Sequence, residues 1–559
     1  MLSEQVVSDF FLCSLGSGIF VTPALVAMGT GSLGGSLFLW AFGGIIATCG
    51  LLVWLQLGLS LPLITTDDGV TRAVPRSGGE KNYLEFIYYS NTRKRPKHLV
   101  KCMYGISFVL VGNLSGNAIA FGIYVMSAAG YTENPPKGPV IGLAVMALTL
   151  TVVLHMISRR SGIYLNNAFA LGKVLLLLAL IVMGFMQAAG YDFHGKPKTT
   201  SGFETQVSFS PGSSNVPSIS DSLLYVVYAY SGFEQPFYVL TEVRTPRKIF
   251  PRYTLIAMSL VIVLFVLVNA AYFCAVAQSD PALAIQRNMA TVFFSRLFPD
   301  AEVAQRVMAG FIAASIFGNL LVMTYTASRV KQEIAKEGIL PWSMLLAKSH
   351  RTVLAWWQSR GYGKRDTLEQ SPMGALLLHL GTSVLLIAVT AMLKPSIAYS
   401  VLVTLYSYVI IVLNGFFTSA GLLYLKLNKQ GRDWSNPNFN PPYGAVYAGI
   451  YFLTCGFMLF AALGKPEDSS PFSSAQSGIQ WYLLPAIGLS VPLWGVLWYG
   501  GLRLKMWWID RELVVERVPR VDPDESPRNP HDNTERQYVM TSEDISSNWV
   551  VPQRRLHGM

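Results

Sequence analysis

Charged residues are scarce in this chain. Asp, Glu, Lys and Arg make up only 13% of its 559 residues, while hydrophobic residues make up 52% and the mean hydropathy is +0.39. A soluble protein of this size normally carries about 25% charged residues. The composition therefore excludes an ordinary soluble domain and indicates a chain that lies mostly within a membrane.

Cysteine and histidine are also few, with five and seven copies. All five cysteines fall in or beside apolar runs, where a free thiol packs as a small hydrophobic group, so we expect no structural disulfide. The sequence has no cluster of His, Asp or Cys that would indicate a membrane-bound enzyme. It also lacks the GxxxxGK[ST] phosphate-binding loop of a nucleotide-driven pump. We therefore expect no catalytic residue, no metal and no cofactor.

Long apolar runs dominate what is present. Runs near the length of a bilayer span, about 20 residues, recur from residue 7 to residue 508. They predict an all-α polytopic membrane protein with twelve spans, at 7–28, 33–61, 101–129, 139–158, 163–188, 220–242, 252–277, 305–328, 372–393, 396–425, 443–463 and 480–508.

The predicted spans divide the chain into three parts. Residues 1–430 would form a core of ten helices, which includes the loops 62–100 and 329–371. Residues 431–508 would add two helices. The remaining tail, 509–559, is charged, contains proline and has few apolar residues, so we expect it to be disordered.

The net charge of +11 could suggest nucleic acid as a partner, but the placement of the basic residues favours another explanation. Basic residues gather in the even loops, such as Arg93, Lys94 and Arg95, and are sparse in the odd loops. The positive-inside rule then places both termini and the even loops in the cytosol. Membrane topology accounts for the charge, and we expect no nucleic acid.

Two predicted spans carry helix-breaking residues near their midpoints. The first is LGSGIFVTP, from Leu15 to Pro23, and the second is YAYSGFEQPFYVLTEV, from Tyr228 to Val243. They open two blocks of five spans each. Interruptions at corresponding positions of two halves are a sequence pointer to the binding site of a transporter. Unwound backbone at this depth is tolerated where it lines a cavity, so we expect these breaks to hold a ligand.

Five stretches carry a resemblance to a known family. They are GSGIFVTP, VPRSGGEKNYLEFIY at 74–88, NNAFALGKVLLLLALI at 166–181, YSGFEQPFYVLTEVRTPRKIFPR at 230–252 and TASRVKQEIAKEGILPW at 326–342. In this order they resemble the amino acid–polyamine–organocation superfamily, and most of all its L-type amino acid transporters and fungal methionine-permease-like members.

The resemblance implies a five-plus-five inverted repeat with discontinuous helices 1 and 6, and transport of amino acids by alternating access. We expect a neutral substrate similar to methionine or leucine, and coupling to protons. An amino acid exchanger and a nutrient sensor on the same fold are the alternatives. The loop AAGYTENPPKGP lacks the cysteine through which L-type carriers bind a heavy chain, so we expect no disulfide-linked partner. The plasma membrane is the expected location, with an internal membrane as the alternative.

The resemblance also implies a substrate site at the two breaks. Backbone N–H groups of Gly16, Ser17 and Gly18 would bind the α-carboxylate at a helix N-terminus. Close helix packing is the other reason for small residues there. The carbonyls of the second break would bind the α-amine, and nearby apolar side chains would line the pocket. The residues assigned to these two roles are Tyr228, Ala229, Ser231 and Gly232 for the break, and Ile19 and Phe233 for the lining.

Three other assignments leave alternatives open. Tyr228 matches an aromatic residue that closes over substrate in the family, but it could also be a core or lipid-facing aromatic. A carboxylate at Glu234 within the membrane costs at least about 2.5–3.5 kcal/mol, which favours a functional or paired group. It could take a proton, sense a cationic substrate, bind Lys173 or pair with a polar neighbour. Lys173 could supply a coupling charge or serve in packing.

Overall fold

The computed structural model describes residues 16, 18–65, 71–89, 98–132, 135–191, 193, 212–243, 246–276, 288–359, 369–428, 439–468, 474, 478–523 and 538–550. Its helices are α2 (Gly18–Thr30), α3 (Leu33–Ser60), α4 (Glu80–Tyr88), α5 (Leu99–Val111), α6 (Ser115–Ala128), α7 (Lys137–Ile157), α8 (Arg159–Ala188), α10 (Val216–Tyr230), η1 (Gln235–Glu242), α11 (Pro246–Ala275), α13 (Met289–Leu297), α14 (Ala301–Ala335), α15 (Ser343–Ala347), α16 (Val353–Ser359), α17 (Met373–Thr390), α18 (Pro395–Tyr406), η2 (Ser407–Leu413), α19 (Asn414–Leu427), α20 (Gly444–Ala461) and α22 (Leu483–Ile509). The strands are β1 (Leu63–Thr65), β2 (Thr71–Ala73), β3 (His350–Arg351), β4 (Gln370–Ser371), β5 (Glu512–Pro523) and β6 (Tyr538–Val550).

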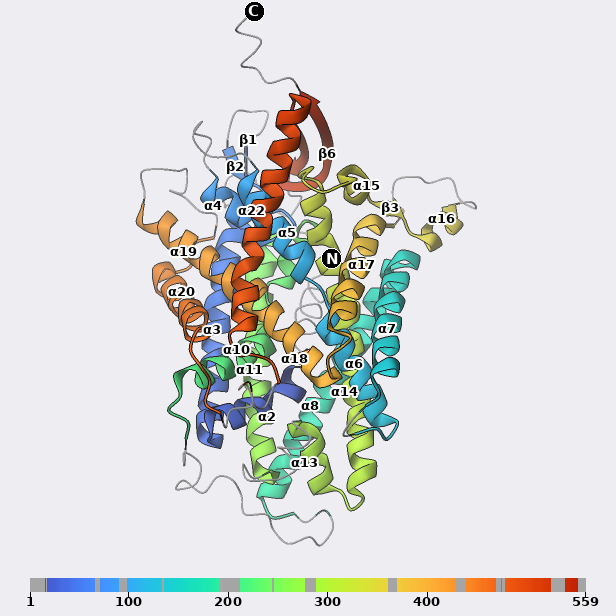
Figure 1. The fold of residues 1–559 in the computed structure, drawn as a ribbon, viewed down its shortest axis with the longest axis vertical. Helices are drawn as coiled ribbons and strands as arrows, with labels where there is room; N and C mark the ends of the chain where they lie inside the picture. Colours follow the sequence, from blue (N-terminus) through green and yellow to red (C-terminus); the bar gives the residue numbers. More distant parts are fainter. Residues whose placement is uncertain are drawn as a thin grey trace, which may run out of the picture.

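Most of the chain is helical, which confirms the all-α polytopic class. Among the described residues, ten helical segments are long and apolar enough to cross a bilayer, and α2 is a shorter apolar helix. The sixth predicted span corresponds to α10 and η1 together. Figure 1 shows the long helices running roughly along the long axis of the molecule, with α13 near one end. The five-plus-five inverted repeat stays a prediction.

The second predicted break is present. α10 ends at Tyr230, and the chain resumes as the 3₁₀ helix η1 at Gln235. Gly232 lies between them with a φ of 109°, a backbone conformation that residues other than glycine rarely adopt. The first break cannot be traced in the same way, because residues 1–15 and Ser17 lie outside the described residues. α2 begins at Gly18 and packs against α10.

Two further interruptions were not predicted. The third span divides into α5 and α6, and the Asn113 side chain accepts a hydrogen bond from the Ser115 N–H at 3.2 Å. The tenth span contains the π-helical turn η2 between α18 and α19. A π-helical turn often marks a functional site. Both interruptions fall within apolar runs and contain no proline. The hydrophobic pattern therefore predicts an unbroken helix at each of them.

The prediction of a disordered tail is wrong for residues 512–523 and 538–550. These residues form the antiparallel pair β5 and β6, which lies at one end of the molecule in Figure 1. β-branched valines such as Val514, Val515 and Val518 favour a strand. The charged residues that suggested a solvated segment are paired with the helical core, as Arg517 and Glu543 show below. Two short pairs, β1 with β2 and β3 with β4, lie in the connecting segments.

Candidate functional site

A small cavity lies where the beginning of α2 meets the end of α10. Its volume is about 30 Å³, and its described lining contains no charged side chain. Five of the predicted site residues line it, together with parts of α6, α14 and α18. The lining residues are Gly16, Gly18, Asn113, Leu114, Gly116, Asn117, Tyr228, Ala229, Ser231, Asn319, Met323, Leu402, Val403 and Tyr406.

The contact between the two interrupted spans is very close at Gly18. A Cβ atom on Gly18 would lie 2.6 Å from the Cα atom of Ala229. A Cβ atom on Gly16 would lie 3.3 Å from the side-chain nitrogen of Asn319. Gly18 therefore fits both roles considered for these glycines, substrate binding and close helix packing. It lines the cavity, and it also allows α2 to approach the α10 backbone.

A chain of polar side chains forms one wall of the cavity. The Tyr228 hydroxyl donates to Asn117 Oδ1 at 2.7 Å, and Asn117 Nδ2 donates to Asn319 Oδ1 at 2.9 Å. The three residues come from α10, α6 and α14, so the wall joins three helices. The sequence analysis did not identify Asn117, whose one signal is that it is a polar residue in an apolar run.

The unwound turn after α10 is held by its own hydrogen bonds. The Ser231 N–H and hydroxyl both donate to the Tyr228 carbonyl, at 3.1 and 2.6 Å. The Gly232 N–H donates to the Glu234 carboxylate at 2.9 Å. The Tyr228 carbonyl, one of the predicted partners of a substrate amine, therefore already accepts two hydrogen bonds.

Ile19, Gly232 and Phe233 do not line this cavity. Ile19 is fully buried in the core. The Phe233 ring packs edge-to-face against Trp54, with 5.7 Å between ring centroids. The apolar lining that was predicted from Ile19 and Phe233 is supplied at this cavity by Met323, Leu402 and Val403.

Lys173 and Glu234 do not pair. Lys173 is buried in α8. The Glu234 carboxylate instead accepts from the Gly232 N–H and, at 3.1 Å, from the Gln235 side-chain amide. Gln235 in turn accepts from the Thr326 hydroxyl at 2.5 Å. Glu234 is thus bound to polar neighbours of its own turn and does not reach the cavity lining.

A second buried carboxylate lies near Glu234. Glu80, at the start of α4, belongs to the PRSGGE motif and accepts from Trp54 Nε1 and the Tyr238 hydroxyl, at 3.1 and 3.0 Å. The Tyr104 hydroxyl approaches its other oxygen at 3.2 Å. Burial, with a further contribution from the Glu234 charge, raises the pKa of Glu80 to about 8.

The raised pKa of Glu80 predicts a pH-dependent stability. Folded protein holds a proton on Glu80 up to about pH 8, whereas the unfolded chain releases it near its ordinary value of 4.5. Unfolding therefore releases a proton between these limits, and the stability from this group falls as pH rises through that window. We expect Glu80→Gln, which imitates the protonated side chain, to flatten the fall in melting temperature between pH 5 and 8.

The matched control for this prediction is Glu302→Gln, because Glu302 is exposed at the start of α14. Melting curves of the purified proteins across the pH range provide the measurement. An unchanged slope in Glu80→Gln would show that Glu80 does not carry the effect.

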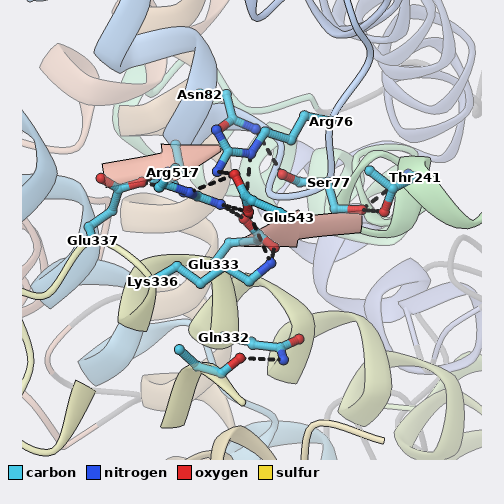
Figure 2. A network of polar contacts seen from close by, with 12 residues as sticks. Arg76, Ser77, Asn82, Thr241, Gln332, Glu333, Lys336, Glu337, Arg517 and Glu543 are labelled. Atoms are coloured by element: carbon cyan, nitrogen blue, oxygen red, sulfur yellow. Dashed lines mark hydrogen bonds and ion pairs between the residues drawn. The ribbon is translucent and has the colours of Figure 1, made fainter. Parts of the chain in front are cut away.

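At the hairpin end, an ion-pair network joins three parts of the chain (Figure 2). The Arg517 guanidinium of β5 binds Glu333 of α14 at 2.7 Å, Glu337 at 2.5 Å and Glu543 of β6 at 2.6 Å. Arg76, which precedes α4, also binds Glu543 at 2.6 Å. The C-terminal hairpin is therefore tied to α14 and to the segment before α4.

A smaller group of ion pairs lies beside this network. Glu242, at the end of η1, binds Arg159 and, at 3.2 Å, Arg329 of α14. The Tyr325 hydroxyl donates to the same carboxylate at 2.9 Å. The broken sixth span is thereby anchored to α8 and α14. Within the described part of the chain, no three His, Cys, Asp or Glu side chains lie close enough together to hold a metal ion.

Comparison with known proteins agrees with this architecture. The profile of a family described as amino acid permease matches residues 6–491. The chain is 27% identical over 503 residues to the high-affinity methionine permease of Saccharomyces cerevisiae, which covers 88% of this chain and 76% of the permease. It is 28% identical over 452 residues to the large neutral amino acids transporter small subunit 2 of Mus musculus, covering 80% of this chain and 73% of that protein.

The b(0,+)-type amino acid transporter 1 of Oryctolagus cuniculus is 29% identical over 328 residues, which are 58% of this chain and 60% of that transporter. All these relatives are named as permeases or transporters, which indicates a transporter and not an enzyme. Because the family profile covers most of the chain, the chain belongs to the amino acid permease family.

Proposed function

We propose that this permease carries neutral, fairly large amino acids, with methionine or leucine first, by alternating access. The observation that carries the proposal is the cavity between α2 and α10. The N-terminus of α2 and the C-terminus of α10 both reach it, and these helix ends have opposite partial charges. A zwitterionic α-amino acid presents a carboxylate and an ammonium group, and the two helix ends are complementary to them.

In this proposal, backbone groups at Gly16, Ser17 and Gly18 bind the carboxylate, and carbonyls at the end of α10 bind the amine. Ala229, which lines the cavity, offers one such carbonyl, whereas the Tyr228 carbonyl would have to exchange one of its two hydrogen bonds from Ser231 for the amine. The described lining contains apolar side chains and no charge, which supports a neutral substrate side chain. The names of the yeast and mouse relatives support the same class of substrate.

A competition experiment tests the substrate. In proteoliposomes that contain the full chain, unlabelled methionine and leucine should each suppress the uptake of labelled methionine, while lysine and glutamate at equal concentration should have little effect. A buried unpaired charge is costly, which is the reason for this selectivity. Stronger competition by lysine than by leucine would reject the neutral assignment. Saturable binding without flux would identify a sensor, and flux only against internal amino acid an exchanger.

We further propose proton coupling, in which Lys173 and Glu234 supply the buried charges. Lys173→Ala should lose accumulation driven by a pH gradient but keep substrate binding, because the lysine does not line the cavity. The measurement is methionine uptake into vesicles with an imposed pH gradient, with sodium present or replaced by choline. Lys465→Ala, at an exposed position, serves as the control.

Two outcomes would contradict the coupling proposal. Accumulation that follows a sodium gradient and ignores pH would reject proton coupling. Normal accumulation by Lys173→Ala would remove the lysine from the mechanism. The plasma membrane as the location, cytosolic termini and function without a disulfide-linked heavy chain belong to the same proposal.

A further inference from the structure

A second cavity, of about 210 Å³, lies beyond the central one. It is larger than the central cavity and is lined by α2, α6, α10, α18 and η2, by residues that follow α20, and by the start of α22 with the residues just before it. Figure 1 places α2 and α18 in the part of the molecule away from the β5–β6 hairpin. The charge distribution of the loops predicts that this side is external.

The linings of the two cavities share four helices, α2, α6, α10 and α18. On α6 the lining passes from Asn117 in the central cavity to Tyr124 in the larger one. On α10 it passes from Tyr228 to Tyr225 and Asp221. Positions 221, 225 and 228 share one face of a helix, and seven residues span about 10 Å at 1.5 Å per residue. The larger cavity therefore continues the path that leads to the central site.

A hydrogen bond joins two helices in the lining of the larger cavity. The hydroxyls of Tyr225 on α10 and Thr404 on α18 are 3.3 Å apart, and both residues line the larger cavity. The Tyr228–Asn117 hydrogen bond closes the central cavity one turn further along α10.

Asp221 is the one charged residue in the described lining of the larger cavity. In the part of the chain that the structure describes, its carboxylate has no hydrogen-bond or ion-pair partner, although it lies within a predicted span. Asp221 lies near the outer end of its predicted span, and ionisable residues in membrane segments commonly face a cavity and mark a substrate or ion pathway. The chemistry that satisfies a lone carboxylate is a cation, and a cation with N–H donors can also hydrogen-bond to it.

The surroundings of Asp221 favour an organic ammonium group over a hydrated metal ion. The lining contains aromatic residues on several sides of the cavity, among them Tyr124, Tyr225, Tyr399 and Trp481. Aromatic faces attract a cation such as an ammonium group. Most of the remaining lining is apolar and offers few of the oxygen ligands that a hard metal cation requires.

We infer that the larger cavity is a second binding site for the amino acid substrate, in which Asp221 binds the α-ammonium group before the substrate reaches the central site. This inference rests on the proposed transport of amino acids. The second site differs from the central site in the group that recognises the substrate. At the second site a side-chain carboxylate binds the ammonium group, and no helix end that binds the substrate carboxylate is required. A primary amine with an apolar chain should therefore bind there even without a carboxylate.

Binding to the purified full chain in nanodiscs tests the inference. The first probe is labelled methionine, and the second is 3-(methylthio)propylamine, which keeps the amine and the side chain but lacks the carboxylate. We expect wild type to bind two methionines per chain and to bind the amine at one site. Asp221→Asn should weaken amine binding at least about tenfold, the loss of one charge-assisted hydrogen bond, and should retain one methionine site.

Further variants separate the larger cavity from the central one. Asp221→Glu should keep amine binding, and Ser400→Leu, which fills the same cavity from α18, should reduce it. Gly18→Leu should leave amine binding intact while it removes the central methionine site. Asp468→Asn, at an exposed position, is the control.

The outcomes distinguish the inference from the proposed function. Failure of wild type to bind the amine, or equal amine binding by wild type and Asp221→Asn, overturns the second site whatever the transport assay shows. Amine binding that depends on Asp221 supports the site even if methionine proves not to be transported, in which case only the proposed substrate fails.

Discussion

Gly18→Leu is expected to abolish uptake of the labelled substrate. A leucine side chain would enter the central cavity, whose volume is only about 30 Å³, and would occupy the space assigned to the substrate carboxylate. Its Cβ atom would also lie 2.6 Å from the Ala229 Cα atom, so α2 would have to move away from the α10 backbone. Uptake per amount of folded protein in proteoliposomes measures the effect.

Two glycine variants separate these causes. Gly172→Leu on α8 places the same side chain where a Cβ atom would meet nothing within 4 Å, and uptake should be normal. Gly16→Ala adds a methyl group 3.3 Å from the Asn319 side chain, which can shift, so this variant should fold and transport with a raised half-saturation concentration. If Gly18→Leu transports normally, the central cavity is not the substrate site.

Glu337→Ala is expected to cause a large loss of stability. Glu337 accepts from Lys81 of α4, from Lys101 of α5 at 2.5 Å and from Arg517 of β5 at 2.5 Å, and its side chain is only 3% exposed. Burial acts to raise the pKa of Glu337, but Lys81 and Lys101 outweigh it and hold the pKa well below its ordinary value. The carboxylate therefore stays charged at neutral pH.

Removing this carboxylate takes away the one acceptor that contacts Lys81, Lys101 and Arg517 together. The half-buried Glu85 remains beside the two lysines, and Glu333 and Glu543 remain beside Arg517. Breaking a buried ion pair by removal of one partner costs about 3–5 kcal/mol. We expect a clearly lower melting temperature in detergent and less folded protein in the membrane. Glu302→Ala, which removes an exposed carboxylate from a pair with Arg306, should change stability by no more than about 0.5 kcal/mol. Equal melting temperatures for the two variants would contradict the assigned importance of Glu337.

Hydrophobic length and helix-breaking residues were sufficient to predict much of the architecture. Each predicted span has a helical counterpart, and the break at Ser231–Glu234 lies where the glycine and proline residues placed it. Gly16, Gly18, Tyr228, Ala229 and Ser231 do meet at one cavity. These features depend on local sequence, because a break in a helix is encoded by residues within that helix.

Features that depend on contacts between distant segments were missed. Asn117 meets Tyr228 across 111 residues, and Asp221 faces a cavity completed by residues beyond 396. The C-terminal hairpin was predicted as disorder because Arg517 and Glu543 resemble solvated charges until their partners on α14 are known. Phe233 was placed at the substrate because it adjoins the break, although its ring points to Trp54. Sequence adjacency does not determine the direction of a side chain in an unwound turn.

The central cavity is too small, at about 30 Å³, for a methionine or leucine molecule. Substrate must therefore bind a conformation in which the Tyr228–Asn117–Asn319 wall has separated from its neighbours. The apparent dissociation constant then equals the intrinsic constant divided by the fraction of molecules in that conformation. If about 1% of molecules were open at rest, apparent affinity would be about 100-fold weaker than intrinsic affinity. The strength of two hydrogen bonds, one from the Tyr228 hydroxyl to Asn117 and one from Asn117 to Asn319, would in this way set the substrate concentration at which the carrier works.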